Sequence, residues 1–238
     1  MTGAPSSGGS PRRAVVLLSG GLDSTTCLAI ATRRDGLEAH ALSFAYGQRH
    51  AAEVEQAKAI ADALGAASHR VARLDLAEVS SSALIDPAIA IPKDRSEAEI
   101  GGDLPATYVP ARNTIFLAVA LGMAETIEAE AIYIGVNAVD FSGYPDCRPE
   151  FIAAFAALAE VACPGRAPRI EAPLLHLSKA QIIRTGHSLG VDYSITHSCY
   201  DPAPGGGACG RCDACLLRRA GFQDAGVPDP TRYADGSG

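Results

Sequence analysis

Apolar runs alternate with segments of helical period along most of the chain. Short runs rich in Val, Leu, Ile and Ala predict buried strands over 14–18, 38–44, 68–74, 131–136 and 170–172. Apolar residues at helical spacing predict helices over 25–32, 51–64, 113–129, 149–162 and 178–189. Strands that alternate with helices are typical of a parallel sheet. We therefore expect an α/β fold built on a doubly wound parallel sheet.

The ends of these segments carry their own signals. Pro149 suits the first turn of a helix, Ser178 suits a helix cap, and Gly65 and Gly190 suit helix ends. Residues 80–110 hold four prolines and no sustained period, which predicts a long loop or a short-helix excursion rather than a strand of the sheet. Because loops of this length in compact domains are often functional, we expect it to act as a lid.

The first strand ends in a turn with the sequence Ser-Gly-Gly-Leu-Asp-Ser over 19–24. Gly20 and Gly21 can take positive φ and leave the backbone open to a ligand, while Ser19, Asp23 and Ser24 are expected to cap the next helix. The turn aims N–H groups and the helix dipole at one point, where a phosphate would bind. It lacks the Gly-Lys-Ser/Thr ending of a Walker A loop and the spacing of a dinucleotide-binding turn.

Composition narrows the class of protein. The 238 residues are 47% hydrophobic and 20% charged, which suits one large domain with a small appendage. The net charge of −7 argues against a protein held on nucleic acid or membrane by bulk electrostatics. No apolar run is long enough to span a bilayer and the first residues do not resemble a signal peptide, so we expect a cytoplasmic protein. The expected divisions are a disordered tail over 1–13, the main α/β domain over 14–195, a four-cysteine module over 196–222 and a C-terminal tail over 223–238.

Polar clusters follow several predicted strands and are expected to face one crevice, since ligands of open parallel sheets bind at the carboxyl ends of the strands. Tyr46, Gln48 and Arg49 could hold adenosine or close over phosphates, although a polar loop before a helix would look the same. Arg112 suits a carboxylate or phosphate, and Asn113 beside it suits a helix cap. Lys179 is either a phosphate-neutralising cation or a solvated surface residue.

Residues 135–151 combine charges of both signs with aromatic rings, as a pocket for a flat, polar heterocycle with a carboxylate requires. A purely structural turn is the alternative. Cys147 in this stretch is a candidate nucleophile or a bystander. The expected substrate contacts are Asn137, Asp140, Tyr144, Asp146 and Arg148.

Four of the seven cysteines lie late in the chain, at 199, 209, 212 and 215. Four thiolates make a closed tetrahedral set that suits structural zinc and leaves no open position for a catalytic water. An iron–sulfur site is the alternative, although the Cys-Pro of the bacterial ferredoxin motif is absent. Cys27 and Cys163 lie within predicted helices and are expected in the core.

The motifs at 19–28, 46–50, 109–113 and 140–151, together with the four-cysteine site, resemble the 7-cyano-7-deazaguanine synthase family of PP-loop ATP pyrophosphatases over residues 14 to 222. The first motif is shared by many ATP pyrophosphatases, whereas the 140–151 motif and the cysteines narrow the choice. The resemblance implies a Rossmann-like, adenine nucleotide alpha hydrolase-like fold with a small C-terminal zinc-binding module.

The implied reaction begins when ATP activates the carboxylate of 7-carboxy-7-deazaguanine and ammonia displaces AMP to give an amide. A second ATP activates the amide oxygen, whose loss leaves a nitrile, in queuosine biosynthesis. The resemblance also implies a homodimer, Mg²⁺ and one Zn²⁺ held by Cys199, Cys209, Cys212 and Cys215. Asp23, Ser24, Arg112 and Lys179 are the expected catalytic residues. The expected ATP contacts are Leu18, Ser19, Gly20, Gly21, Leu22, Asp23, Ser24, Thr25, Thr26, Cys27 and Leu28.

Three other functions fit parts of the sequence. A tRNA-modifying ATP pyrophosphatase would need a basic surface, which the acidic charge balance does not favour. The same chemistry could act on another carboxylate, such as a protein terminus. A zinc-stabilised binding module could use the loop as an ATP sensor, and substrate-dependent ATP consumption would separate it from an enzyme.

Overall fold

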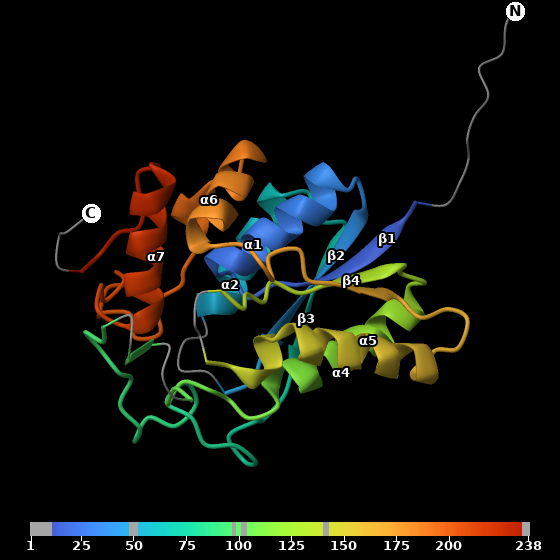
Figure 1. The fold of residues 1–238 in the computed structure, drawn as a ribbon, viewed down its shortest axis with the longest axis horizontal. Helices are drawn as coiled ribbons and strands as arrows, with labels where there is room; N and C mark the ends of the chain where they lie inside the picture. The colour runs from blue at the N-terminus through green and yellow to red at the C-terminus, as the bar shows by residue number, and fades with distance from the viewer. Residues whose placement is uncertain (1–10, 48–51, 97–98, 101–103, 140–142, 235–238) are drawn as a thin grey trace, which may run out of the picture.

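A computed structural model describes residues 11–47, 52–96, 99–100, 104–139 and 143–234. Within these residues, five parallel strands form one sheet in the order β3-β2-β1-β4-β5 (Figure 1). The strands are β1 (Arg13–Leu17), β2 (Glu38–Ala45), β3 (Ser68–Arg73), β4 (Ala131–Tyr133) and β5 (Arg169–Glu171). All five predicted strands are confirmed. β4 ends three residues earlier than the predicted 131–136, and its short partner β5 is shifted by one residue from the predicted 170–172.

Strand β1 lies at the centre of the sheet and is buried on both faces. Val16 pairs with Ala41 of β2 and Tyr133 of β4. Val16 packs into one hydrophobic core while its neighbour Val15 packs into the other. Side chains of a strand alternate between the two faces of a sheet, so this strand separates two apolar layers, as its unbroken apolar sequence predicts.

Helices cover both faces, which confirms the doubly wound arrangement. One core receives residues from α1 (Leu22–Ala29), α2 (Ala52–Ala63), α6 (Lys179–Ser188) and α7 (Asp213–Ala225). The other receives residues from α4 (Arg112–Thr126) and α5 (Pro149–Ala162). Figure 1 shows α1 and α6 on the opposite side of the strands from α4 and α5. Helix α7 was not predicted, because its sequence after the last cysteine has no clear apolar stripe.

Helix ends agree with the sequence at some positions and differ at others. Ser178 caps α6 through a reciprocal pair of hydrogen bonds with Gln181. Helix α1 instead has Gly21 as its N-cap, without a side-chain bond. The predicted caps Ser19 and Ser24 are wrong, because their hydroxyls bond to each other at 3.0 Å. Asp23 is not a cap either, since it lies inside the first turn.

Asn113 is a further correction to the predicted helix caps. The N-cap of α4 is Ala111, at a φ of 56°. The Asn113 amide instead donates to the carbonyl of Asp146 at 3.0 Å. It therefore ties the start of α4 to the turn η2 (Pro145–Cys147).

The described residues of the 80–110 segment contribute no strand to the sheet, as predicted, and they pack against the four-cysteine module. Lys93 forms a bridge with Cys212, and Arg95 grips both carboxylate oxygens of Asp213. Ala83 and Ile91 share a small apolar core with the cysteines. The loop and the module therefore stabilise each other.

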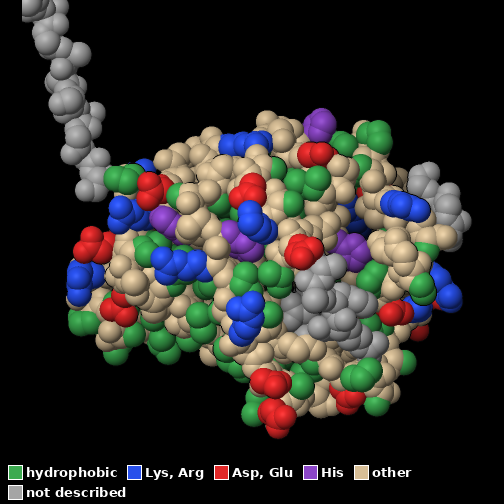
Figure 2. Space-filling model, turned by 180° about the vertical axis from the view of Figure 1, so that it is seen from behind, with side chains coloured by type: hydrophobic (Ala, Val, Ile, Leu, Met, Phe, Trp, Pro, Cys, Tyr) green, Lys and Arg blue, Asp and Glu red, His purple; other side chains and the backbone are tan. Residues whose placement is uncertain are grey.

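The predicted terminal tails lie partly outside the described residues. Arg13 already belongs to β1, and Asp229 and Tyr233 bond to each other at 2.7 Å. No described helix is both long and apolar enough to cross a membrane. On the face drawn in Figure 2, Lys and Arg side chains alternate with Asp and Glu, and the described residues form no continuous basic surface there.

Candidate active site

A cavity of about 340 Å³ opens beyond the carboxyl ends of β1, β2 and β4, where the strand order reverses. The sequence predicts a crevice at this edge of the sheet, and the structure brings most of the polar clusters to it. The predicted site residues that line the cavity are Leu18, Ser19, Gly21, Leu22, Asp23, Ser24, Tyr46, Arg112, Asn137, Tyr144 and Lys179.

The turn after β1 forms one wall of this cavity. Gly20 takes a φ of 87°, which L side chains rarely adopt, and Gly21 is the N-cap of α1. The first-turn N–H groups of Asp23 and Ser24 have no intrahelical acceptor. A Cβ on Gly135, which follows β4, would lie 3.1 Å from the Ser24 nitrogen, a tight contact, so glycine favours the close approach of this segment to the turn. The geometry presents backbone donors and the positive end of a helix to an anion.

Charged side chains make the cavity electropositive although the chain is acidic. Lys179 Nζ lies 2.8 Å from both carboxylate oxygens of Asp23, and the two side chains are 15% and 29% exposed. Lys179 is therefore not a solvated surface residue. Asp23 is the only carboxylate among the described lining residues. Arg218 also lines the cavity but pairs with Asp229 at 3.2 Å, so Arg112 supplies the excess positive charge. A polyanion such as ATP would be attracted to this charge balance.

Arg112 lies over the Tyr144 ring, 5.9 Å from its centroid, and no described carboxylate pairs with it. Burial opposes its charge, but Tyr46 and Tyr144 lead the interactions that together raise the pKa of Arg112 above its usual value. The guanidinium is therefore a permanent cation with donors left for a ligand.

Aromatic rings form the wall beside the turn. Phe44 and Phe116 stack with centroids 3.8 Å apart, and Tyr46 meets Phe116 edge to face at 5.4 Å. All three line the cavity, which gives it a surface for a flat heterocycle. The predicted contacts Gln48 and Arg49 lie outside the described residues.

Several predicted ligand contacts are engaged within the protein instead. Asn137 lines the cavity but donates to the Leu174 and Leu177 carbonyls and accepts from the Val139 N–H. Asp146 is buried behind the wall and accepts from the Asn113 N–H at 3.1 Å. Both side chains therefore hold the loop in shape.

The remaining residues of the predicted substrate segment differ in their position. Arg148 is exposed and does not line the cavity, whereas the Tyr144 ring does, with its hydroxyl 2.8 Å from Thr107 Oγ1. Asp140 lies outside the described residues. The Cys147 thiol lines the cavity, and burial raises its pKa to about 12. A thiol with this pKa is protonated at neutral pH, which favours the bystander role.

The last four predicted ATP contacts face away from the cavity. Thr25 Oγ1 bonds to the Gly21 carbonyl, and Thr26 Oγ1 lies 2.7 Å from the Tyr193 hydroxyl. Cys27 and Leu28 are fully buried in the core, as expected for Cys27 from the sequence. The geometry gives these four side chains a packing role in α1. Gly20 shapes the turn but does not line the cavity.

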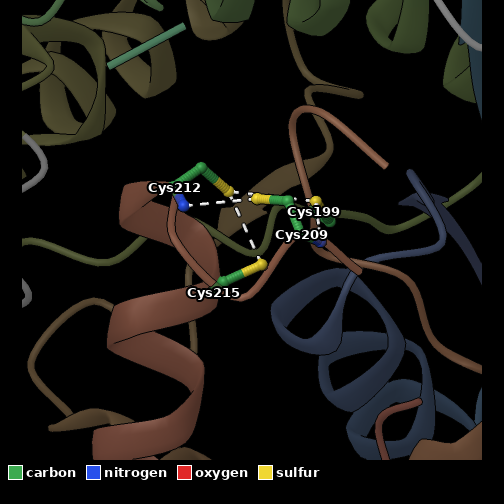
Figure 3. A group of neighbouring side chains, drawn as sticks. All are labelled: Cys199, Cys209, Cys212 and Cys215. Carbon is green, nitrogen blue, oxygen red and sulfur yellow. Dashed lines mark hydrogen bonds between the residues drawn. The ribbon is translucent and has the colours of Figure 1, made fainter. Parts of the chain in front are cut away.

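The four late cysteines converge at one point beside the cavity (Figure 3). All four Sγ atoms lie within 4.8 Å of one another, and Cys212 Sγ lies 4.0 Å from Cys199 Sγ and 3.6 Å from Cys215 Sγ. A tetrahedral zinc with Zn–S bonds of about 2.3 Å would place sulfurs about 3.8 Å apart, so the set fits this ion. Three of the four are buried.

Backbone N–H groups support thiolates at this cluster. The Cys209 N–H donates to Cys199 Sγ at 3.2 Å, and the Cys212 N–H donates to Cys209 Sγ at 3.3 Å. These donors offset negative charge on sulfur, as a site for a divalent metal with four thiolates requires.

Sequence reasoning did not assign a role to several residues that line the cavity, namely Ser43, Phe116, His197, Ser198, Tyr200 and Arg218. Ser198 and Tyr200 flank the first metal-binding cysteine, and this placement is the signal that could have identified them. Arg218 follows the last cysteine by three residues, in a Leu-Leu-Arg-Arg run that looks like an ordinary helix surface.

Comparisons with known proteins agree over most of the chain. A family model described as "Queuosine biosynthesis protein QueC" matches residues 13–226. The chain is 63% identical over 228 residues to a 7-cyano-7-deazaguanine synthase of Solidesulfovibrio magneticus, which covers 94% of this chain and 96% of that protein. The same identity holds over 227 residues with a protein of that name from Anaeromyxobacter dehalogenans, at 94% and 96% coverage. Among solved structures, a predicted tRNA methyltransferase subunit from Methanocaldococcus jannaschii matches 94% of this chain and 96% of its own, with 16% identity and a TM-score of 0.48.

Proposed function

Since the chain belongs to the QueC family of queuosine biosynthesis proteins, we propose that it is an ATP-dependent ligase that converts 7-carboxy-7-deazaguanine and ammonia to 7-cyano-7-deazaguanine. One observation carries the proposal: a cavity at the carboxyl edge of the sheet combines a phosphate-type turn, an aromatic wall and an excess of cations. These features suit ATP together with a flat acid.

The reaction consists of two adenylylations. A carboxylate oxygen of the substrate attacks the α-phosphorus of ATP, and pyrophosphate leaves. Ammonia then attacks the acyl carbon, loses a proton, and expels AMP to give the amide. In the second round the amide oxygen attacks another ATP, and loss of AMP and the remaining N–H protons leaves the nitrile. Negative charge develops on the departing phosphates in both rounds. We therefore expect the rate enhancement to come mainly from positioning of the reactants and electrostatic stabilisation of this charge.

The turn after β1 binds the pyrophosphate portion in this proposal. The N–H groups of Asp23 and Ser24 donate to phosphate oxygens at the start of α1. Lys179 can transfer its ionic contact from the Asp23 carboxylate to the phosphates. Asp23 would then be the residue that holds Mg²⁺, and the ion would supply further charge neutralisation at the leaving group.

Arg112 and the aromatic residues bind the acid. The guanidinium faces the cavity without a described carboxylate partner, so it can grip a substrate carboxylate through two parallel bonds. Tyr144 and Phe116 offer rings for the deazapurine. Asp140, Gln48 and Arg49 remain predicted contacts from the sequence, whereas the exposed position of Arg148 removes it from the proposed pocket.

Zinc has a structural role in this proposal. Four thiolates close its coordination sphere, and the cysteines anchor the long loop and the start of α7. We expect about one zinc per chain by elemental analysis. A Cys212→Ser variant should lose the ion, because it leaves three thiolates where a closed structural zinc site needs four ligands. Full zinc occupancy in this variant would contradict the assignment.

We further propose a homodimer that assembles through the outer face of α5. This face exposes Ala154, Ala157, Leu158 and Val161, and the two large side chains are 52% and 83% exposed. Exposed apolar faces of this kind are typical of self-association. Sedimentation would test the dimer, and we expect Val161→Glu to yield monomers.

We also propose that the protein is cytoplasmic, because a cluster of four free thiols that could bind a metal suits a reducing compartment.

The deciding experiment uses 7-carboxy-7-deazaguanine, ammonium and ATP with purified protein. Mass spectrometry should detect the amide and then the nitrile, with about two AMP formed per nitrile from the two rounds proposed above. A protein that releases AMP with another carboxylate but not with this acid would contradict the substrate. Binding of bulk tRNA with no product from the acid would favour a tRNA-modifying function, which the mixed surface charge does not suggest.

A further inference from the structure

We propose that Arg218 is a positioning residue for the nucleotide turn, acting through the segment 193–198. This inference rests on the proposed function, because it concerns how the turn is kept ready for phosphate. Arg218 lies in α7, three residues after the last metal-binding cysteine, and only 3% of it is exposed. A buried guanidinium beside a cavity must have bonded partners, and those partners indicate what it holds.

The guanidinium of Arg218 donates hydrogen bonds to other groups of the protein. Nη1 donates to Thr196 Oγ1 at 2.8 Å and to Ser198 Oγ at 3.4 Å, and Nη2 donates to the Tyr193 carbonyl at 3.1 Å. Nε donates to Asp229 at 3.2 Å, which supplies the counter-charge. Three of these four contacts go to one short segment. Arg218 therefore fixes that segment, and four of its five N–H donors are engaged within the protein.

The segment held by Arg218 touches the nucleotide turn directly. The His197 N–H donates to the Gly20 carbonyl at 3.0 Å. The Leu22 N–H points at Ser198 Oγ, 3.5 Å away. A continuous path of contacts thus runs from the guanidinium, through residues 196–198, to the backbone of the turn.

The bond to the Gly20 carbonyl sets the direction of the peptide between Gly20 and Gly21. In a trans peptide the carbonyl and the following N–H point in opposite directions. With the Gly20 carbonyl held by His197, the Gly21 N–H faces the Ser19 hydroxyl on the wall of the cavity. Two adjacent glycines would let this peptide rotate and turn a carbonyl oxygen toward the phosphates. The contact with residue 197 prevents this rotation.

The test compares Arg218→Gln with Arg219→Gln. Arg219 is its neighbour in α7, but its guanidinium lies 3.8 Å from the Tyr233 ring and donates to the Gly210 carbonyl. We expect Arg218→Gln to raise KM for ATP at least tenfold, the scale for loss of charge-assisted bonds, while KM for the acid stays unchanged. Arg219→Gln should leave both constants near wild type. Zinc content and thermal melting of both variants are measured alongside.

A second variant keeps the inference testable if Arg218→Gln does not fold. Thr196→Val removes the hydroxyl that accepts from Nη1 with little change in shape. Oγ1 also donates to the Tyr193 carbonyl at 2.7 Å, so the variant loses two hydrogen bonds within the segment. It should raise KM for ATP about threefold or more, again without changing KM for the acid. Equal KM values for ATP in wild type and Thr196→Val, or in the two arginine variants, would overturn the inference. Failure of the proposed function would look different, because wild-type protein would form no nitrile.

Discussion

The nucleotide turn and the segment after β4 line the same cavity, but they present different groups to it. At residues 18–24 the backbone provides the donors, and the fold itself aims them. In the described parts of residues 137–148, two of the polar side chains bond to the protein: Asn137 donates to two carbonyls, and Asp146 accepts from the Asn113 N–H. Of the substrate contacts predicted there, Tyr144 faces the cavity with its ring.

This difference follows from how each segment is built. A strand, two glycines and a helix allow few backbone paths, so a six-residue motif determines the geometry of the turn. A polar loop allows many paths, and its shape depends on distant partners such as the Leu174 and Leu177 carbonyls. Local sequence therefore predicts a site made of backbone better than a site made of side chains.

The largest effect should come from the turn. Asp23→Ala removes the carboxylate that holds Lys179 at 2.8 Å and is proposed to hold Mg²⁺. We expect kcat/KM for nitrile formation to fall by about 100-fold or more, because charge on the leaving pyrophosphate loses its support. Steady-state assays of AMP and nitrile measure it.

Asp62→Ala is the control for this variant. It removes an exposed carboxylate that accepts from Lys58 Nζ at 2.7 Å outside the cavity, so its kcat/KM should stay near wild type. Nitrile formation by Asp23→Ala at the wild-type rate would show that the turn does not bind the reacting nucleotide.

A smaller effect, confined to KM for the acid, is expected at Arg112 in the same cavity. Arg112→Gln keeps a polar side chain but removes the cation proposed to grip the substrate carboxylate. KM for the acid should rise about 10- to 100-fold while KM for ATP changes little. Arg148→Gln is the matched control, since Arg148 is exposed and outside the lining. If Arg148→Gln raised KM for the acid and Arg112→Gln did not, the original sequence assignment would be restored.

Sequence alone predicts the features that depend on neighbouring residues in the chain, but it does not predict those that depend on distant partners. The five strands and the Ser178 cap agree with their apolar periods and local polar residues, because both depend on neighbours in the chain. The Asn113 cap fails because the side chain finds a distant carbonyl, that of Asp146. Arg218 could not be recognised, since its partners at 193–198 and Asp229 meet it only after folding. The four cysteines were evident because thiolate spacing is itself the signal.

A stability effect should replace an activity effect at Asp146. Asp146→Ala leaves the buried Asn113 N–H without its acceptor, so the free energy of unfolding should fall by about 1–3 kcal/mol. Chemical denaturation measures this change, and KM for the acid should stay within about twofold of wild type, as expected for a group outside the pocket. Asp140→Ala, a substrate contact predicted from sequence, should show the reverse pattern. A raised KM for Asp146→Ala with unchanged stability would place its carboxylate on the substrate.

The smallest effect is expected at Cys147, although its thiol lines the cavity. Burial is the largest cause that raises the pKa of this thiol, from 9.0 to about 12, so almost no thiolate exists at neutral pH. Cys147→Ser should therefore keep kcat within about threefold of wild type, since a protonated thiol is a poor nucleophile. In folded wild-type protein, alkylation of this residue should increase about tenfold per pH unit up to pH 12, with no plateau near 9. Loss of nitrile formation in Cys147→Ser, together with a trapped thioester in wild type, would instead make this side chain part of the chemistry. The segment after β4 would then resemble the nucleotide turn in contributing reacting groups.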